Sequence, residues 1–119
     1  MLAVSLGDAL EQRAQSYLEK KRPFEGFLLD RMGSFLAEAA MQRLDRQLTK
    51  GCLACGARTT RRFSPGYRDF GLDAQKVFVG LIGDRLPGLR LADNGQLQPE
   101  KTITAIKGVT TRVMSEPSL

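Results

Sequence analysis

Residues 62–67 read Arg-Phe-Ser-Pro-Gly-Tyr, and this short stretch decides how the rest of the chain is interpreted. Pro65 fixes φ at the second position of a tight turn, and Gly66 accepts the positive φ that a type II turn requires at the third. An arginine, Arg62, precedes the turn, and a tyrosine, Tyr67, follows it. The stretch therefore predicts a cation and an aromatic ring near each other, on backbone that a polar ligand with an anionic group and a flat ring can approach closely.

Three ordered segments of the chain resemble one protein family. Residues 62–70 resemble the RxSPGY-x-D signature of the activation domain of vitamin B12-dependent methionine synthase and its stand-alone relatives. Residues 97–106, LQPEKTITAI, resemble the M-x-P-x-K-S-V-S-A-I run of those relatives, and residues 29–34, LDRMGS, resemble their LDAIGS helix segment. The resemblance spans roughly residues 28–108.

This resemblance implies a fold, a ligand and a partner. The fold is α+β, with helices on a twisted antiparallel sheet, as one module over residues 1–113. The composition of residues 114–119 separately predicts a loose tail. The ligand is S-adenosylmethionine, and the partner is a corrinoid protein or domain, whose oxidised cobalamin is restored by reduction and methyl transfer from S-adenosylmethionine in methionine biosynthesis. The cobalt and the transferred methyl group supply that chemistry, so the chain is an accessory module that orients them.

The resemblance also assigns roles to five residues. Arg62 matches the arginine that contacts the S-adenosylmethionine carboxylate, a group well matched by a guanidinium fork. Ser64 matches a position whose backbone contacts the ligand, and Pro65 and Gly66 shape the loop. Tyr67 matches the tyrosine that faces the ligand and the cobalamin.

Four departures from the family pattern keep a second interpretation open. The PACP run that follows the tyrosine in methionine synthase is replaced by Arg-Asp-Phe at residues 68–70. A family carboxylate falls at Ser34, an aromatic pair falls at residues 107–108, and a longer N-terminal part with an acidic ligand contact is missing. The alternative is a structural interaction module that docks a corrinoid protein and binds no small molecule.

Hydrophobic periodicity and turn residues predict the elements. Apolar side chains at helical spacing predict three main helices, over residues 8–21, 24–49 and 73–83. Residues 93–96 predict a hairpin turn, since Asn-Gly tolerates two positive φ values. Strands are expected over residues 2–6, 89–92 and 101–105. Helices and hairpin strands without regular βαβ alternation again indicate α+β structure.

Several single residues have two explanations each. Gly33 in mid-helix costs ~1 kcal/mol against alanine, which either close packing of another element or approach of a ligand to the backbone explains. Cys52 and Cys55 are expected in a glycine-flanked loop over residues 51–56, as incidental or structural thiols, a redox pair, or a metal site shared across a dimer. Lys101 is expected to be a solvated charge on an edge strand.

Composition limits the possible functions. The chain has 119 residues, no histidine and a net charge of +5. Its length suits one domain, and it contains neither a nucleophile–base pair nor a set of metal ligands. Its basic residues are scattered, so nucleic-acid binding rests on charge alone. No run approaches the ~20 apolar residues of a membrane helix, and a cytoplasmic location is expected.

An incomplete sheet would expose an edge, which favours a homodimer or a partner that completes the sheet.

Overall fold

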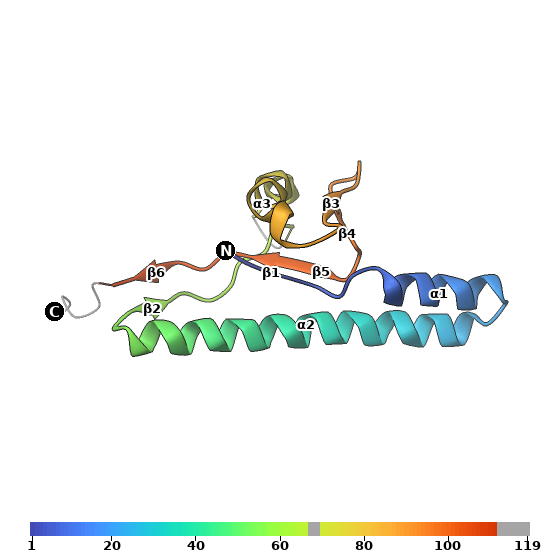
Figure 1. Ribbon diagram of the computed structural model, residues 1–119, viewed down its shortest axis with the longest axis horizontal. Helices are drawn as coiled ribbons and strands as arrows, with labels where there is room; N and C mark the ends of the chain where they lie inside the picture. Colours follow the sequence, from blue (N-terminus) through green and yellow to red (C-terminus); the bar gives the residue numbers. More distant parts are fainter. Residues whose placement is uncertain (67–69, 112–119) are drawn as a thin grey trace.

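One long helix, α2, organises the molecule. The computed structural model of the chain describes residues 1–66 and 70–111. α2 (Pro23–Ala54) runs along most of an elongated molecule of 63 × 27 × 26 Å, and α1 (Ala9–Glu19) folds back along its N-terminal part (Figure 1). The other elements are β1 (Leu2–Ser5), β2 (Arg58–Thr59), the 3-10 turn η1 (Leu72–Ala74), α3 (Gln75–Ile82), the 3-10 turn η2 (Gly83–Arg85), β3 (Arg90–Leu91), β4 (Leu97–Gln98), β5 (Thr102–Ala105) and β6 (Val109–Thr110).

The three predicted helices are present, but the predicted end of the second is wrong. α2 passes through Gly51 and Cys52, where a loop was expected, because a helical glycine costs only ~1 kcal/mol. The helix ends at Ala54, and the chain turns away at Gly56, whose φ is +80°. The amide of Gly56 donates to the Leu53 carbonyl, and that of Ala57 donates to the Cys52 carbonyl. This pair of bonds forms a Schellman motif, which satisfies carbonyls that the helix leaves open.

Small residues let α1 and α2 approach closely. Gly26 and Gly33, both buried, lie seven residues apart on one face of α2. A Cβ built on Gly26 would lie 2.9 Å from the Ala14 carbonyl oxygen of α1, and one built on Gly33 would lie 2.6 Å from Cδ2 of Leu10. Gly33 is therefore explained by packing, one of the two explanations that the sequence left open.

The strands form three antiparallel pairs. β1 pairs with β5, β2 with β6 and β3 with β4. Mixed helices and antiparallel strands confirm the α+β class. The single sheet expected from the sequence is not seen among the described residues, whose strands are two to four residues long. An isolated antiparallel bridge joins Phe63 to Ile106; along the chain, Phe63 follows β2, and Ile106 lies between β5 and β6.

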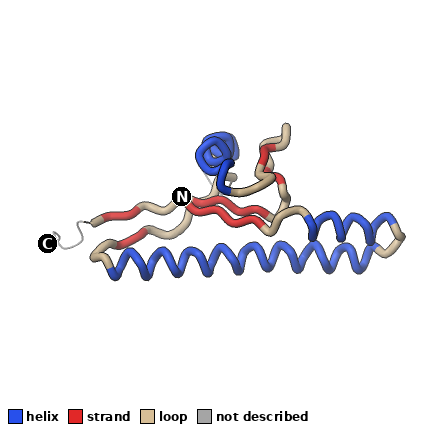
Figure 2. Tube along the Cα trace, in the orientation of Figure 1, coloured by secondary structure: helices blue, strands red, loops and turns tan. Residues whose placement is uncertain are grey.

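The β1–β5 ribbon separates two sides of the molecule (Figure 2). On one side, Leu2 and Ala105 are buried with Met41 of α2, which is fully buried. Val4 and Ile103 pack against this cluster, together with Leu44 and Leu48. Alternate residues of both strands line this face, as the period of two of a strand requires.

α3 and the β3–β4 hairpin lie on the opposite side of the ribbon from α2 (Figure 1). The hydroxyl of Thr104 in β5 donates to Oε1 of Gln75 in α3 at 2.8 Å, and both residues are buried. The hairpin lies where the sequence predicted it, closed by a hydrogen bond from the Gly95 amide to the Ala92 carbonyl. Of the Asn-Gly pair, Gly95 has a positive φ, of +86°, and Asn94 does not. The loop is a tight turn followed by a left-handed glycine.

Candidate functional site

The signature stretch runs beside the end of β5 and continues from β2. The Thr60 amide donates to the Gly108 carbonyl at 2.9 Å, and Phe63 and Ile106 exchange both backbone bonds. Arg61 and Phe63 lie together, with the guanidinium 5.0 Å from the ring centroid. Arg62 instead contacts α2. Because successive side chains of an extended backbone point to opposite faces, the adjacent residues Arg61 and Arg62 contact different parts of the molecule.

Arg62 bridges two carboxylates of α2. Its Nε donates to Oδ2 of Asp45 at 3.1 Å, and its Nη2 donates to Oε1 of Glu38 at 3.0 Å. The Arg62 side chain is 21 % exposed, so this contact is partly shielded from water. A guanidinium has five N–H groups, and a ligand carboxylate that bound here would accept from those that do not face Asp45 or Glu38. It would then be the third carboxylate beside the single positive charge of Arg62.

Lys107 contacts the same acidic residue from the end of β5. Its ammonium donates to Oδ1 of Asp45 and, at 2.8 Å, to the hydroxyl of Thr49, while its side chain is only 4 % exposed. The hydrogen bond from Lys107 lowers the pKa of Asp45, the charges of Lys107 and Arg62 add to this effect, and partial burial opposes it. Asp45 is thus held as a carboxylate between two cations.

Lys101 makes a third cationic contact with α2. Its Nζ lies 2.8 Å from Oδ1 of Asp30 and donates to the Ser34 hydroxyl at 2.9 Å. Its side chain is 10 % exposed, so the prediction of a solvated edge charge is wrong. Gly33 leaves room for it, since a Cβ at that position would lie 3.2 Å from Cε of Lys101. Ser34 stands where the family resemblance places a carboxylate, and here its hydroxyl accepts a hydrogen bond from Lys101.

These contacts form a row that we call the α2 ion-pair row. It consists of three cations and three α2 carboxylates: Arg62, Lys101, Lys107, Asp30, Glu38 and Asp45. Because three positive charges meet three negative ones, the row is formally neutral. The partners of these charged residues could not be predicted from the sequence, since they lie 17 to 71 residues apart in the chain.

The turn after Arg62 has part of the predicted geometry. Gly66 has φ of +86°, as the turn interpretation requires, and its amide donates to the Phe70 carbonyl at 2.7 Å. Pro65 is buried and Ser64 is half-buried. Tyr67, the fifth residue of the predicted ligand site, lies outside the described residues, as does the predicted tail over residues 114–119. Contact between Arg62 and an aromatic ring at position 67 therefore stays a prediction.

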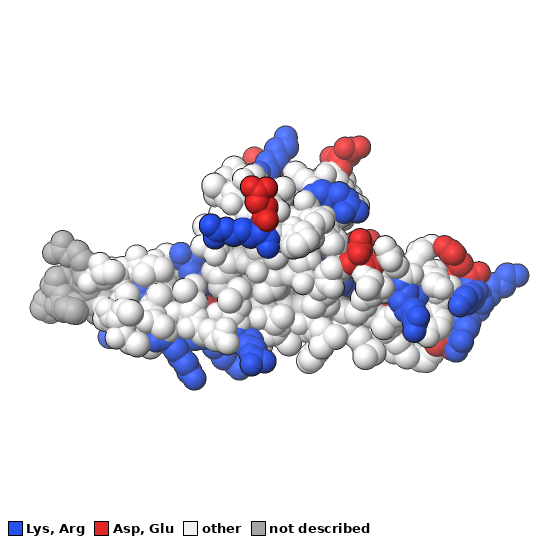
Figure 3. Space-filling view, in the orientation of Figure 1, with Lys and Arg blue, Asp and Glu red and all other residues white. Residues whose placement is uncertain are grey.

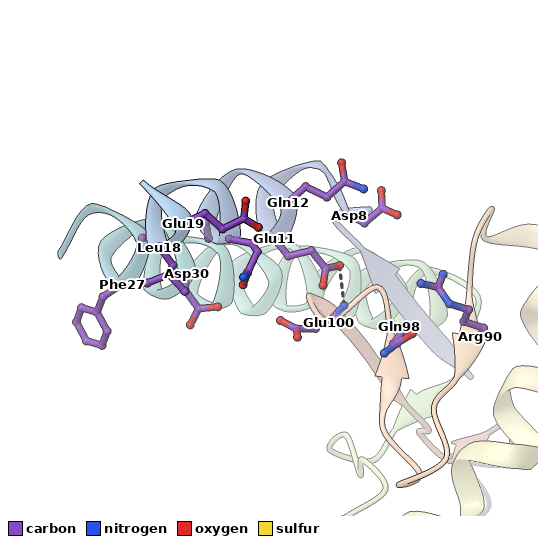
Figure 4. A pocket seen from close by; sticks show the side chains of 13 residues that line it. Asp8, Glu11, Gln12, Leu18, Glu19, Phe27, Asp30, Arg90, Gln98 and Glu100 are labelled. Atoms are coloured by element: carbon purple, nitrogen blue, oxygen red, sulfur yellow. Dashed lines mark hydrogen bonds between the residues drawn. The ribbon is translucent and has the colours of Figure 1, made fainter. Parts of the chain in front are cut away.

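A hollow formed by described residues lies elsewhere. A groove of about 780 Å³ lies between α1, the first turns of α2 and the segment around β3 and β4 (Figure 4). None of the described residues of the predicted ligand site lines it. Its lining consists of Asp8, Glu11, Gln12, Ala14, Gln15, Leu18, Glu19, Gly26, Phe27, Asp30, Arg90, Gln98 and Glu100.

The chemistry of this groove is acidic. It carries five carboxylates and one arginine, Arg90. Two of these carboxylates have partners on the chain. Asp30 forms an ion pair with Lys101, and Glu11 accepts a hydrogen bond from the Glu100 amide at 3.1 Å (Figure 4). Such a groove attracts cationic groups and repels a carboxylate. It does not replace Arg62 as the candidate site for an anionic group.

The cysteine pair lies at the C-terminal end of α2 rather than in a loop. Cys52 is in the last turn and Cys55 follows it, and both are free thiols. A redox dithiol uses the positive end of a helix dipole, which is the opposite end of the helix. Over residues 1–66 and 70–111, no group of three or more cysteine, aspartate or glutamate side chains is arranged to hold a metal ion.

The comparisons with known proteins leave the family open. No protein-family model matches the chain, and the comparison with curated proteins gives no match. In the described part of the chain, no helix combines the length and the apolar character that crossing a membrane requires.

Proposed function

We propose that the chain is an activation-domain-like accessory module of a cobalamin-dependent methyltransferase. It binds S-adenosylmethionine and docks a corrinoid protein, which holds the cobalamin. One observation carries the proposal: the three segments that resemble the family are joined by direct contacts. Lys101 of the 97–106 segment contacts Asp30 and Ser34 of the 29–34 segment, and Ile106 bridges to Phe63 of the signature.

In this proposal the signature stretch holds the ligand. Arg62 binds the S-adenosylmethionine carboxylate through the N–H groups that do not face Asp45 and Glu38, and the α2 ion-pair row fixes its orientation. The backbone at Ser64 contacts the ligand, the Pro65–Gly66 turn brings that backbone close, and Tyr67 faces the ligand and the corrinoid. The transferred methyl group comes from S-adenosylmethionine, and the protein positions it, in the cytoplasm and for methionine biosynthesis.

A second candidate function is a docking module that binds no small molecule. The ion pairs of Arg62 favour it, because they give this arginine a structural role that needs no ligand. A carboxylate that binds Arg62 must also lie near Glu38 and Asp45, which lowers its affinity. The two candidates differ in one measurable property, the affinity for S-adenosylmethionine.

Calorimetric titration with S-adenosylmethionine tests the proposal. Wild-type protein should bind, and Arg62→Ala should weaken binding about ten- to hundredfold, since a charge-assisted pair is worth ~1.5–3 kcal/mol. Arg61→Ala is the matched control, because Arg61 is adjacent but contacts Phe63 instead of α2. Wild-type protein that shows no binding at millimolar ligand would leave the docking module. Equal losses in both variants would contradict the role of Arg62.

A further inference from the structure

The outward face of α2 carries a largely apolar surface. Six large side chains at three- and four-residue spacing leave 43 to 76 % of their surface exposed on one side of the helix. We call them the outer stripe: Phe24, Phe27, Leu28, Met32, Phe35 and Leu36. The stripe faces away from the side that packs on α1 and the strands, which carries the buried residues Gly26, Gly33, Ala37 and Met41; Phe27, at its edge, also lines the groove beside α1.

The outer stripe is large enough for a stable protein interface. A phenylalanine side chain offers ~150–250 Å² for burial, so the three rings, which are 59 to 76 % exposed, leave about 400 Å² open to water. This area alone matches the largest apolar patch on a typical monomer, ~300–600 Å². The two leucines and the methionine extend it towards the ~800 Å² that each partner contributes to a standard interface.

The charges along α2 indicate how a partner lies on the stripe. Beyond the stripe the same face is basic, because Arg43 and Lys50 follow Leu36 by seven and fourteen residues, and Arg46 lies between them. Figure 3 shows basic side chains below the C-terminal half of α2, whereas the lower edge beneath its middle is white. Two parallel copies of α2 would place these basic halves against each other. Two antiparallel copies that meet at the stripe would place them at opposite ends.

We propose that the outer stripe is the interface of an antiparallel homodimer, in which α2 packs against α2 of a second copy. Such an isologous contact buries the same six residues twice and closes by two-fold symmetry. Arg31 lies within the stripe, four residues from both Phe27 and Phe35, and is exposed; its stem extends the apolar contact while its charged end reaches water. This surface differs from the sheet edge that the sequence suggested as a dimer contact, and it needs no S-adenosylmethionine.

Sedimentation of the full chain over a wide concentration range tests the proposal. The wild type should be a dimer, and Phe35→Glu should weaken dimerisation about tenfold or more, because it places a charge in the apolar contact. Leu81→Glu is the matched control: Leu81 is 66 % exposed, but it lies on α3. Both side chains are largely exposed, so circular dichroism should show that both variants keep the wild-type secondary structure. A wild type that stays monomeric at high micromolar concentration, or a dimer that Phe35→Glu leaves intact, would overturn the proposal.

Cross-linking then tests the orientation, in a Cys52→Ser, Cys55→Ser background. Met32→Cys lies near the middle of the stripe and should form an intermolecular disulfide on oxidation. Arg46→Cys lies fourteen residues, about 21 Å, further along the helix. In an antiparallel dimer the two copies of this position are about 40 Å apart, so it should not cross-link. Cross-linking by both variants to the same extent would overturn the antiparallel arrangement.

Discussion

Lys107, two residues after β5, places its ammonium directly against the Asp45 carboxylate in the C-terminal half of α2. The Lys107 side chain is 4 % exposed, so removal of its partner leaves a nearly buried charge. Asp45→Asn should therefore lower the free energy of unfolding by about 3 kcal/mol, the lower end for a buried pair, since Asp45 is itself 24 % exposed. Urea denaturation measures the change. Glu38→Gln, at a 50 % exposed position, is the control and should cost under about 1 kcal/mol.

The same pair predicts a pH dependence. The hydrogen bond from Lys107 lowers the pKa of Asp45 in the folded protein, so ionised Asp45 stabilises the fold. This stabilisation is complete above the unfolded pKa of about 3.9 and is lost as the pH falls through the lower folded pKa. Asp45→Asn should therefore flatten the fall in unfolding free energy below about pH 4. Identical pH profiles for wild type and variant would contradict this role.

Even the smallest side chain at position 26 should lower the free energy of unfolding. Gly26→Ala places a methyl group 2.9 Å from the Ala14 carbonyl oxygen, which belongs to backbone and cannot rotate away. The variant should lose roughly 1–3 kcal/mol, as overpacking does, despite the better helix propensity of alanine. Thermal melting and urea titration measure it. Gly51→Ala is the control, because no atom lies within 4 Å of its added Cβ, and it should gain ~0.5–1 kcal/mol.

The fold was predictable where local signals decide it. Spacing of apolar residues located the helices, and residues 93–96 located the hairpin, because both signals act over a few residues. The end of α2 was missed because the ~1 kcal/mol penalty at Gly51 is smaller than the gain from continued helix, and the capping bonds form only at Gly56.

The candidate site was predictable only in part. The positive φ of Gly66 followed from its place in the Pro-Gly turn. The burial of Lys101 did not, because its partner Asp30 is far away in sequence and nothing near residue 101 signals it. The pairing of Arg62 with α2 was missed for the same reason. Contacts between distant segments depend on how the strands lie along α2, which periodicity does not specify.

A buried hydrogen bond fixes α3 on the ribbon. Thr104 is 2 % exposed and Gln75 is 7 % exposed, and their side chains meet at 2.8 Å. Thr104→Val keeps the shape but removes the hydroxyl, which leaves Oε1 of Gln75 buried without this donor. The variant should lose about 1–3 kcal/mol of unfolding free energy. Thr104→Ser retains the hydroxyl and should recover part of the loss. A neutral Thr104→Val would show that Gln75 finds water instead.

Removal of the Lys101 ammonium should lower the free energy of unfolding, whereas removal of a solvated lysine on a strand edge would not. Lys101→Met keeps most of the stem and removes the ammonium that contacts Asp30 and Ser34. Because Asp30 is 46 % exposed, water can solvate the freed carboxylate, and the loss should stay near 1 kcal/mol. High salt should reduce the difference between wild type and variant, since the ion pair is partly screened. A salt-independent difference of the same size would assign the effect to packing.

Arg62 predicts a separation between stability and ligand binding. Arg62→Lys keeps the charge but loses the fork that spans Asp45 and Glu38, so it should cost about 1 kcal/mol of unfolding free energy, and Arg62→Ala about 1.5–3. Arg61→Ala, at an exposed position, should stay within about 0.5 kcal/mol. Titration of the same variants with S-adenosylmethionine, below their melting temperatures, measures the ligand affinity of each. If the proposed ligand role holds, Arg62→Lys should recover only part of the affinity while it remains folded. Affinity that follows the folded fraction alone would assign Arg62 to structure, and would favour the docking module.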